Sequence, residues 1–222
     1  MSNGRSQQVM ASTSTSSSSS SDIPSPPNRP IYIAKLKGQP NRRGHMMIYI
    51  PNLTSLSHDP SPSSSENREG RPPSPGTVLQ VIGAPMLGFN HEIIRNHNIN
   101  DESNGVLSTL ALVGLVEGRH VRDPPSAGLE KTDRTYDADS LEGWALRTAA
   151  PRKTENFLDP AQASKIRDCQ NWVEDFVGLL VQRGVLPESA TQVVRENMDP
   201  QTGLALRSVN SLITGPPGGS KR

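Results

Sequence analysis

The stretch Asp168–Val173, with the sequence DCQNWV, contains the only cysteine of this 222-residue chain and opens a strongly apolar segment. Apolar positions recur here every three or four residues, at Ile166, Cys169, Val173, Phe176 and Leu180. This spacing predicts an amphipathic helix that buries one stripe of side chains. Gly184 and Pro187 end the pattern, as glycine and proline commonly do after a helix.

The sequence leaves two starts open for this helix. Asp159 followed by Pro160 is a typical N-cap and first helical residue, and this start places Cys169 in the third turn. Alternatively, Asp168 is the N-cap and Cys169 is the first helical residue. The difference matters because the partial positive charge of a helix N-terminus stabilises an anion only within the first turn.

Runs of β-branched and aromatic residues upstream predict strands at residues 31–36, 45–50, 76–83 and 108–117. Pro40 and Asn41 predict a turn between the first two runs, and therefore an antiparallel hairpin. In the third run, Leu79 and Val81 lie on one face and Gln80 lies on the other. The fourth run predicts a buried strand, although periodicity alone also allows a short helix.

Residues 88–100 mix apolar and polar side chains and predict an irregular, weakly ordered strand. Two more helices are predicted at residues 139–149 and 188–197. Because strands come first and helices come last, the expected class is α+β, with an antiparallel sheet of about four strands packed against a C-terminal helical part. Trp144 and Trp172 are expected to be core anchors of that part.

Three segments are too polar or too rich in proline to bury a core. They are a Ser/Pro-rich arm at 1–29, a proline/serine-rich insertion at 55–75 and a C-terminal tail at 201–222. We expect the arm to be disordered and the insertion to be a flexible surface excursion. The remaining residues, within 30–200, are expected to form a single domain.

The charge balance argues against two classes of partner. The formal net charge is +1, from 23 basic and 22 acidic residues, without a block of like charge. This balance gives no electrostatic support for binding nucleic acid or a membrane surface. No apolar run is long enough to span a bilayer, and no signal peptide is recognisable. A single cysteine forms no internal disulfide, so the expected location is the cytoplasm or nucleus.

A histidine stands at the start of the second predicted strand. His45 follows Gly44 and leads the apolar sequence MMIYI, far upstream of Cys169. A thiol and an imidazole form a nucleophilic pair, because the imidazole takes the thiol proton and the thiolate attacks a carbonyl carbon. Gln80 is the nearest polar side chain on the next strand that can face such a pair.

The order of these pieces resembles a known family. The sequences GHMMIYI at 44–50, GTVLQVIG at 76–83 and CQNWV at 169–173 are similar to a group of uncharacterised fungal proteins. That group is distantly similar to circularly permuted papain-like folds, such as the lecithin retinol acyltransferase-like and PPPDE-type peptidase families. The resemblance covers residues 30–186. The acyltransferase pattern has a tryptophan after the histidine and a second histidine on the next strand, where this chain has Met46 and Gln80.

The resemblance implies a permuted papain-like site in which Cys169 is the nucleophile, His45 is the base and Gln80 orients the imidazole or donates to an oxyanion. The expected activity is thiol-dependent hydrolysis or acyl transfer on a protein or a small-molecule acyl substrate, without cofactor or metal. Alternatively, Cys169 is a core cysteine, since free cysteines are often buried, and the fold serves as a non-catalytic interaction module.

The other histidines match no metal-site spacing. His91, His97 and His120 are therefore expected to be solvated loop residues.

Overall fold

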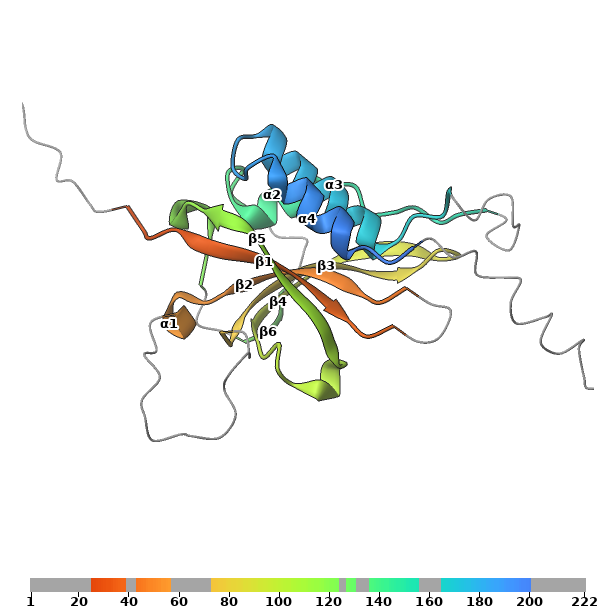
Figure 1. Cartoon of the computed structure of the whole chain (residues 1–222), viewed down its shortest axis with the longest axis horizontal. Coiled ribbons are helices and arrows are strands. Elements are labelled where there is room, and N and C mark those ends of the chain that lie inside the picture. Colours follow the sequence, from red (N-terminus) through yellow and green to blue (C-terminus); the bar gives the residue numbers. More distant parts are fainter. Residues whose placement is uncertain are drawn as a thin grey trace, which may run out of the picture.

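The computed structural model describes residues 25–38, 43–56, 73–123, 127–130, 136–155 and 165–200, and their strands form one antiparallel sheet (Figure 1). The strand order across the sheet is β5-β1-β2-β3-β4-β6. The strands are β1 (Arg29–Leu36), β2 (Met46–Pro51), β3 (Gly76–Ala84), β4 (Gly88–His97), β5 (Leu107–Val116) and β6 (Gly128–Glu130).

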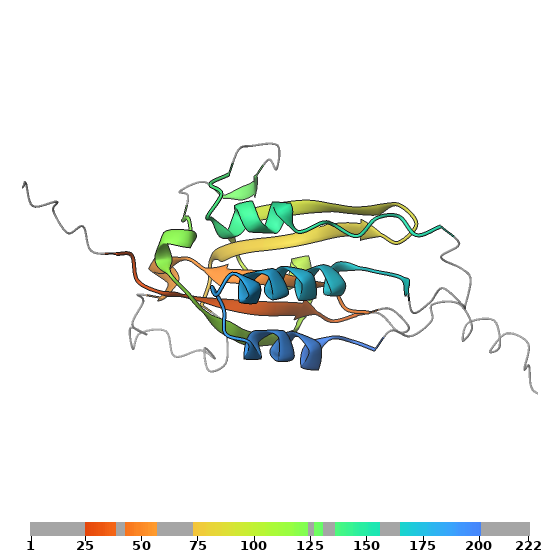
Figure 2. The same cartoon turned by 90° about the horizontal axis from the view of Figure 1, so that it is seen from above.

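Helices cover one face of this sheet. Figures 1 and 2 show α2 (Leu141–Arg147), α3 (Cys169–Gln182) and α4 (Ser189–Asn197) side by side above the strands. Helix α3 packs on β2 and β3, and α4 packs on β5. The short helix α1 (Leu53–Leu56) and the 3-10 turns η1 (Glu102–Asn104) and η2 (Gly118–His120) complete the described elements.

The main core lies between the sheet and the helices. Trp172 is its largest fully buried side chain, and it stacks on Phe176 with ring centroids 5.5 Å apart. Its indole N–H donates to the carbonyl oxygen of Thr148 at 3.2 Å, so the polar atom of the ring is satisfied. Trp144 is also buried in this cluster. Both tryptophans are therefore core anchors, as the sequence predicts.

A second, smaller cluster lies on the opposite face of the sheet. It is built around Met47, Tyr49 and Val78, whereas their neighbours Ile48 and Leu79 belong to the helix-side core. This division follows the alternation of side chains along a strand. Gln80 stands between Leu79 and Val81, which are both in the helix-side core, so its side chain lies on the face away from the helices.

The α+β class and the antiparallel hairpin of β1 and β2 are confirmed, and the sheet has six described strands instead of about four. The strand predicted within 88–100 is present as β4, but it is not weakly ordered, because it pairs with β3 along most of its length with one register shift. Residues 108–117 largely form a strand, as predicted, but the expectation that this strand is buried is wrong. β5 is an edge strand, and Leu112 and Leu115 are 51% and 56% exposed.

The predicted arm, insertion and tail fall largely outside the described residues. The structure describes residues 25–29 of the arm, residues 55, 56 and 73–75 of the insertion, and none of the tail at 201–222. Arg29 is buried and already belongs to β1, one residue before the expected start of the domain.

Candidate functional site

Helix α3 begins at Cys169, so the second of the two predicted starts is the observed one. Residues 166–168 are not helical. The carboxylate of Asp168 accepts hydrogen bonds from the backbone N–H groups of Gln170 and Asn171, and the Asn171 side chain accepts from the N–H of Asp168. This reciprocal capping box fixes the start of the helix and places the cysteine in the first turn.

The thiol of Cys169 is buried at this helix start. The residue is 8% exposed and belongs to the helix-side core. Burial raises the pKa of Cys169 to about 11, and the nearby charge of Asp168 adds to this shift, whereas the backbone N–H groups of Met46 and Gln170 and the charge of Arg43 oppose it. The sulfur is therefore a neutral thiol at pH 7.

A row of three polar side chains lies on the other face of the sheet. His45 donates its Nε2–H to the Oε1 atom of Gln80 at 2.8 Å, and Gln80 donates from Nε2 to the carboxylate of Glu92 at 3.0 Å. Gln80 and Glu92 are paired across β3 and β4. The three residues form a continuous chain of hydrogen bonds that runs from the residue before β2 across β3 to β4.

This row determines which nitrogen of His45 carries the proton. An ionised Glu92 only accepts hydrogen bonds, so the amide NH2 of Gln80 must face it and the amide oxygen must face His45. Nε2 of the neutral imidazole is then protonated, and Nδ1 keeps its lone pair. No described residue forms a hydrogen bond with Nδ1, so this atom is available to accept a proton.

The structure thus brings two of the three predicted site residues into contact. His45 and Gln80 are hydrogen bonded, and Cys169 reaches the same end of the sheet from the helix side. Its sulfur accepts from the N–H of Met46, one residue along the chain from His45. Within the described part of the chain, no hydrogen bond joins the sulfur to the imidazole. The thiol and the imidazole therefore lie at the same end of the sheet, near the start of β2, but on opposite faces of it.

A buried network, which we call the Gln170 clamp, joins the segments that carry these groups. Its members are Arg43, Gly44, Asp168, Gln170 and Asp199. The fully buried amide of Gln170 donates to the Gly44 carbonyl at 2.8 Å and to the Asp199 carboxylate at 2.9 Å. It accepts from the Arg43 guanidinium at 2.7 Å and from the Asp199 N–H at 2.8 Å. All four hydrogen-bonding positions of the amide are used.

The clamp also fixes the segment before His45. Arg43 forms an ion pair with Asp168 at 2.9 Å, and the N–H of Gly44 donates to Asp199 at 2.7 Å. A Cβ atom at position 44 would lie 2.3 Å from the carbonyl oxygen of Leu36, so only glycine allows this close approach. The clamp therefore ties the start of β2 to the start of α3.

Sequence reasoning misses Glu92 and most of the clamp. Glu92 lies in the segment predicted to be irregular, so its register opposite Gln80 was not deducible. Asp199 follows the last described helix and is brought in only by tertiary packing. Burial opposes its ionisation, but hydrogen bonds from Lys35, Gly44 and Gln170 outweigh this and lower the pKa of Asp199.

The other histidines are not solvated loop residues, so that expectation is wrong. His91 lies in β4, bonds through Nε2 to the Thr148 carbonyl at 2.8 Å and contacts the edge of Trp172. His97 ends the same strand, and His120 is buried in η2. Among the described residues, no group of three His, Cys, Asp or Glu side chains is placed to hold a metal ion, and no helix is long and apolar enough to cross a membrane.

The raised pKa of Cys169 predicts a loss of stability at alkaline pH. The unfolded chain releases this proton near 9.0, but the folded protein holds it to about 11. The neutral thiol therefore costs no stability below pH 9.0, and the folded state loses about 2–3 kcal/mol as the pH rises through that interval. Urea unfolding of the wild type and of Cys169→Ala at about pH 8 and about pH 11 measures this difference.

The alanine variant should lose less stability than the wild type between the two pH values. Both proteins keep Tyr49, and burial raises the pKa of Tyr49 to about 12, so its contribution cancels in the comparison. Equal losses in the two proteins would contradict a buried, neutral Cys169 thiol.

Comparison with known proteins assigns this chain to a protein family. The chain matches a family described as "Family of unknown function (DUF6540)" over residues 31–187, a region that contains His45, Gln80 and Cys169. No curated protein and no solved structure matches the chain. Because the matched region covers well over half of the sequence, the protein belongs to the DUF6540 family.

Proposed function

We propose that this protein has a permuted papain-like fold and acts as a thiol-dependent hydrolase or acyltransferase, with Cys169 as nucleophile, His45 as base and Gln80 as the residue that orients the imidazole. The observation that carries the proposal is the hydrogen bond from His45 to Gln80, at 2.8 Å, because the next residue, Met46, donates its backbone N–H to the sulfur of Cys169 at the start of α3. A base held by a polar partner and a nucleophile at a helix start are the parts that such chemistry needs.

The raised pKa of Cys169 decides how the reaction starts. A neutral thiol must lose its proton as it attacks, so Nδ1 of His45 accepts the proton while the sulfur forms a bond to the acyl carbon. The tetrahedral oxyanion then collapses to a thioester, and the imidazolium returns the proton to the departing amine or alcohol. Water or another acceptor, deprotonated by His45, cleaves the thioester and regenerates the thiol.

The start of α3 offers stabilisation for the oxyanion. The N–H groups of Gln170 and Asn171 are used by Asp168, whereas no described residue accepts from the N–H of Cys169 itself. This N–H lies at the positive end of the helix dipole and is the donor we assign to the oxyanion. The substrate class is an amide or ester of a protein or a small acyl compound. A free thiol of this kind suits a reducing compartment, the cytoplasm or nucleus.

Alkylation with iodoacetamide tests the pair directly. If Nδ1 of His45 assists deprotonation, Cys169 is alkylated at pH 7 in the folded protein, and His45→Ala lowers the rate constant about a hundredfold. His97→Ala is the matched control, because it removes a histidine from the end of β4 and leaves the row intact, and its rate should equal that of the wild type. Mass spectrometry gives the rate of adduct formation at the single cysteine.

A second function competes with this one. The 8% exposure of Cys169 and its pKa of about 11 favour a non-catalytic interaction module that keeps the fold and uses the cysteine as a core residue. This alternative predicts equally slow alkylation in the wild type and in His45→Ala, with rates that rise only toward the thiol pKa. That result would remove the enzymatic proposal and support the interaction module.

A further inference from the structure

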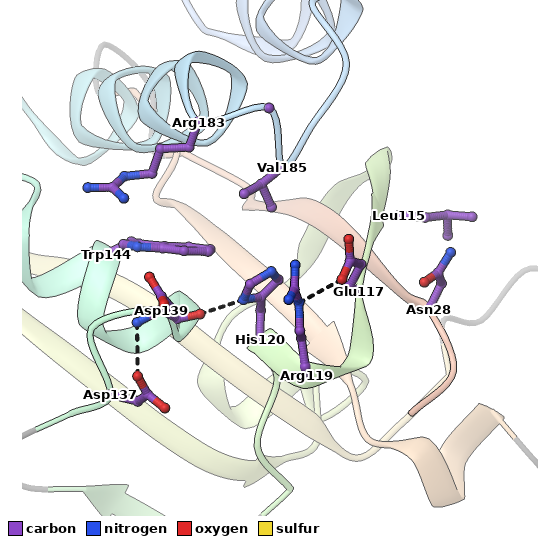
Figure 3. Close-up of a pocket in the computed structure, with 11 residues that line it drawn as sticks. Asn28, Leu115, Glu117, Arg119, His120, Asp137, Asp139, Trp144, Arg183 and Val185 are labelled. Atoms are coloured by element: carbon purple, nitrogen blue, oxygen red, sulfur yellow. Dashed lines mark hydrogen bonds and ion pairs between the residues drawn. The ribbon is translucent and has the colours of Figure 1, made fainter. Parts of the chain in front are cut away.

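A cavity lies at the C-terminal end of α3, opposite to the end that carries Cys169. Its volume is about 720 Å³, within the range of small-molecule sites, and it is bordered by η2, the start of α2 and the residues that follow α3 (Figure 3). Cys169 is the first residue of the 14-residue helix and Arg183 follows the last, so the cavity is about 20 Å from the thiol along the helix axis. It is separate from the proposed thiol site.

A nearly buried histidine projects into this cavity. His120 is 9% exposed, and Figure 3 shows its ring among the lining residues, beside Trp144, with ring centroids 4.9 Å apart. Its Nδ1 atom lies 2.5 Å from the backbone carbonyl oxygen of Asp139. A carbonyl only accepts, so Nδ1 carries the proton and Nε2 of the neutral ring keeps its lone pair. No described residue forms a hydrogen bond with Nε2.

The cations around the cavity are already engaged. Arg119 forms an ion pair with Glu117 at 2.6 Å, and the guanidinium of Arg183 lies over the Trp144 ring, 5.5 Å from its centroid. The carboxylate of Asp139 has no cationic partner among the described residues.

The second carboxylate on this wall belongs to Asp137. Among the described residues, its carboxylate accepts one hydrogen bond, at 3.0 Å, from the backbone N–H of Asp139. The cavity therefore presents three acceptors that can take further hydrogen bonds: Nε2 of His120 and the carboxylates of Asp137 and Asp139.

We propose that this cavity binds an ammonium or guanidinium group. Such a group supplies several N–H donors and a positive charge, which match one imidazole lone pair and two carboxylates. The same group occurs on free amines and on the side chains of basic peptides, and both sources present identical donors to these acceptors.

Calorimetric titration of the full chain with Nα-acetyl-arginine methylamide tests the site, with the citrulline analogue as the neutral control of nearly identical shape. The arginine compound should bind saturably and the citrulline compound about tenfold more weakly or worse, because charge-assisted hydrogen bonds contribute about 1.5–3 kcal/mol. Methylguanidinium alone tests whether the peptide groups are needed. Binding equal to that of the arginine compound assigns the site to the cation itself, and weaker but saturable binding assigns it to a basic peptide side chain.

Two variants separate this site from nonspecific charge attraction. Asp139→Asn removes an exposed carboxylate at the cavity and should weaken binding about tenfold. Glu196→Gln removes an exposed carboxylate on α4 and should leave binding unchanged. Equal binding of the arginine and citrulline compounds, no saturable binding at millimolar concentration, or equal losses in the two variants would overturn the assignment.

Discussion

Replacing Trp172 with alanine is expected to lower the free energy of unfolding by about 3–5 kcal/mol, the usual range for a fully buried large aromatic residue. Trp172 is 0% exposed, stacks on Phe176 and donates to the carbonyl of Thr148. The substitution removes this packing, opens a cavity between α3 and the sheet, and leaves the Thr148 carbonyl with one partner fewer. Urea denaturation at pH 7 measures the loss.

Two further variants serve as references for the stability loss of Trp172→Ala. Trp172→Phe keeps an aromatic ring on Phe176 but not the hydrogen bond, and it should lose clearly less stability than the alanine variant. Ile82→Ala truncates an exposed side chain of β3 and should change the free energy of unfolding by no more than about 0.5 kcal/mol. A Trp172→Ala variant as stable as Ile82→Ala would show that α3 does not pack on the sheet as described.

Replacing Arg95 with methionine is also expected to cost about 3–5 kcal/mol, because it leaves buried carboxylates without their cation. The Arg95 side chain, 2% exposed, lies 2.7 Å from Glu142 and 2.6 Å from Glu130. Burial opposes the charge on Arg95, but the two glutamates outweigh that effect and raise the pKa of Arg95. The guanidinium is therefore ionised at pH 7.

A double-mutant cycle distinguishes a lost ion pair from lost packing. Removing both charges with Arg95→Met and Glu142→Met should cost less than Arg95→Met alone, since no unpaired Glu142 carboxylate remains. Thermal unfolding followed by circular dichroism gives the four stabilities that the cycle needs. If the double variant is less stable than Arg95→Met by the full cost of a second independent substitution, the charges do not interact in the folded protein.

Much of the fold can be predicted from local sequence patterns. The apolar residues from Ile166 to Leu180 recur every three or four positions, which is the spacing of side chains along one face of a helix, and they predict α3. The alternation of side chains in residues 76–83 predicts which face of β3 carries Gln80. The cap at Asp168 is one of two starts that the sequence allows. The observed start is decided by the reciprocal bonds with Asn171 and by the Gln170 clamp, which includes residues 126 positions earlier in the chain.

The remaining features depend on contacts that no local pattern encodes. The apolar content of residues 108–117 is the same for a central strand and for an edge strand, and only the crossing of β5 to the far side of β1 decides between them. Glu92 and Asp199 are polar residues of ordinary appearance, and their roles arise from the register of β4 and from the packing of α4. His120 is one of five histidines and is distinguished only by its burial.

The position of β1 has a consequence for how the chain acquires its structure. β1 lies between β2, its immediate successor, and β5, which follows about 70 residues later. During synthesis, the backbone groups of β1 that face β5 cannot all form their hydrogen bonds until residue 116 has left the ribosome. Pairing between strands that are distant in sequence slows folding and prolongs the exposure of an unpaired strand edge. We therefore expect nascent chains that end before β5 to bind chaperones.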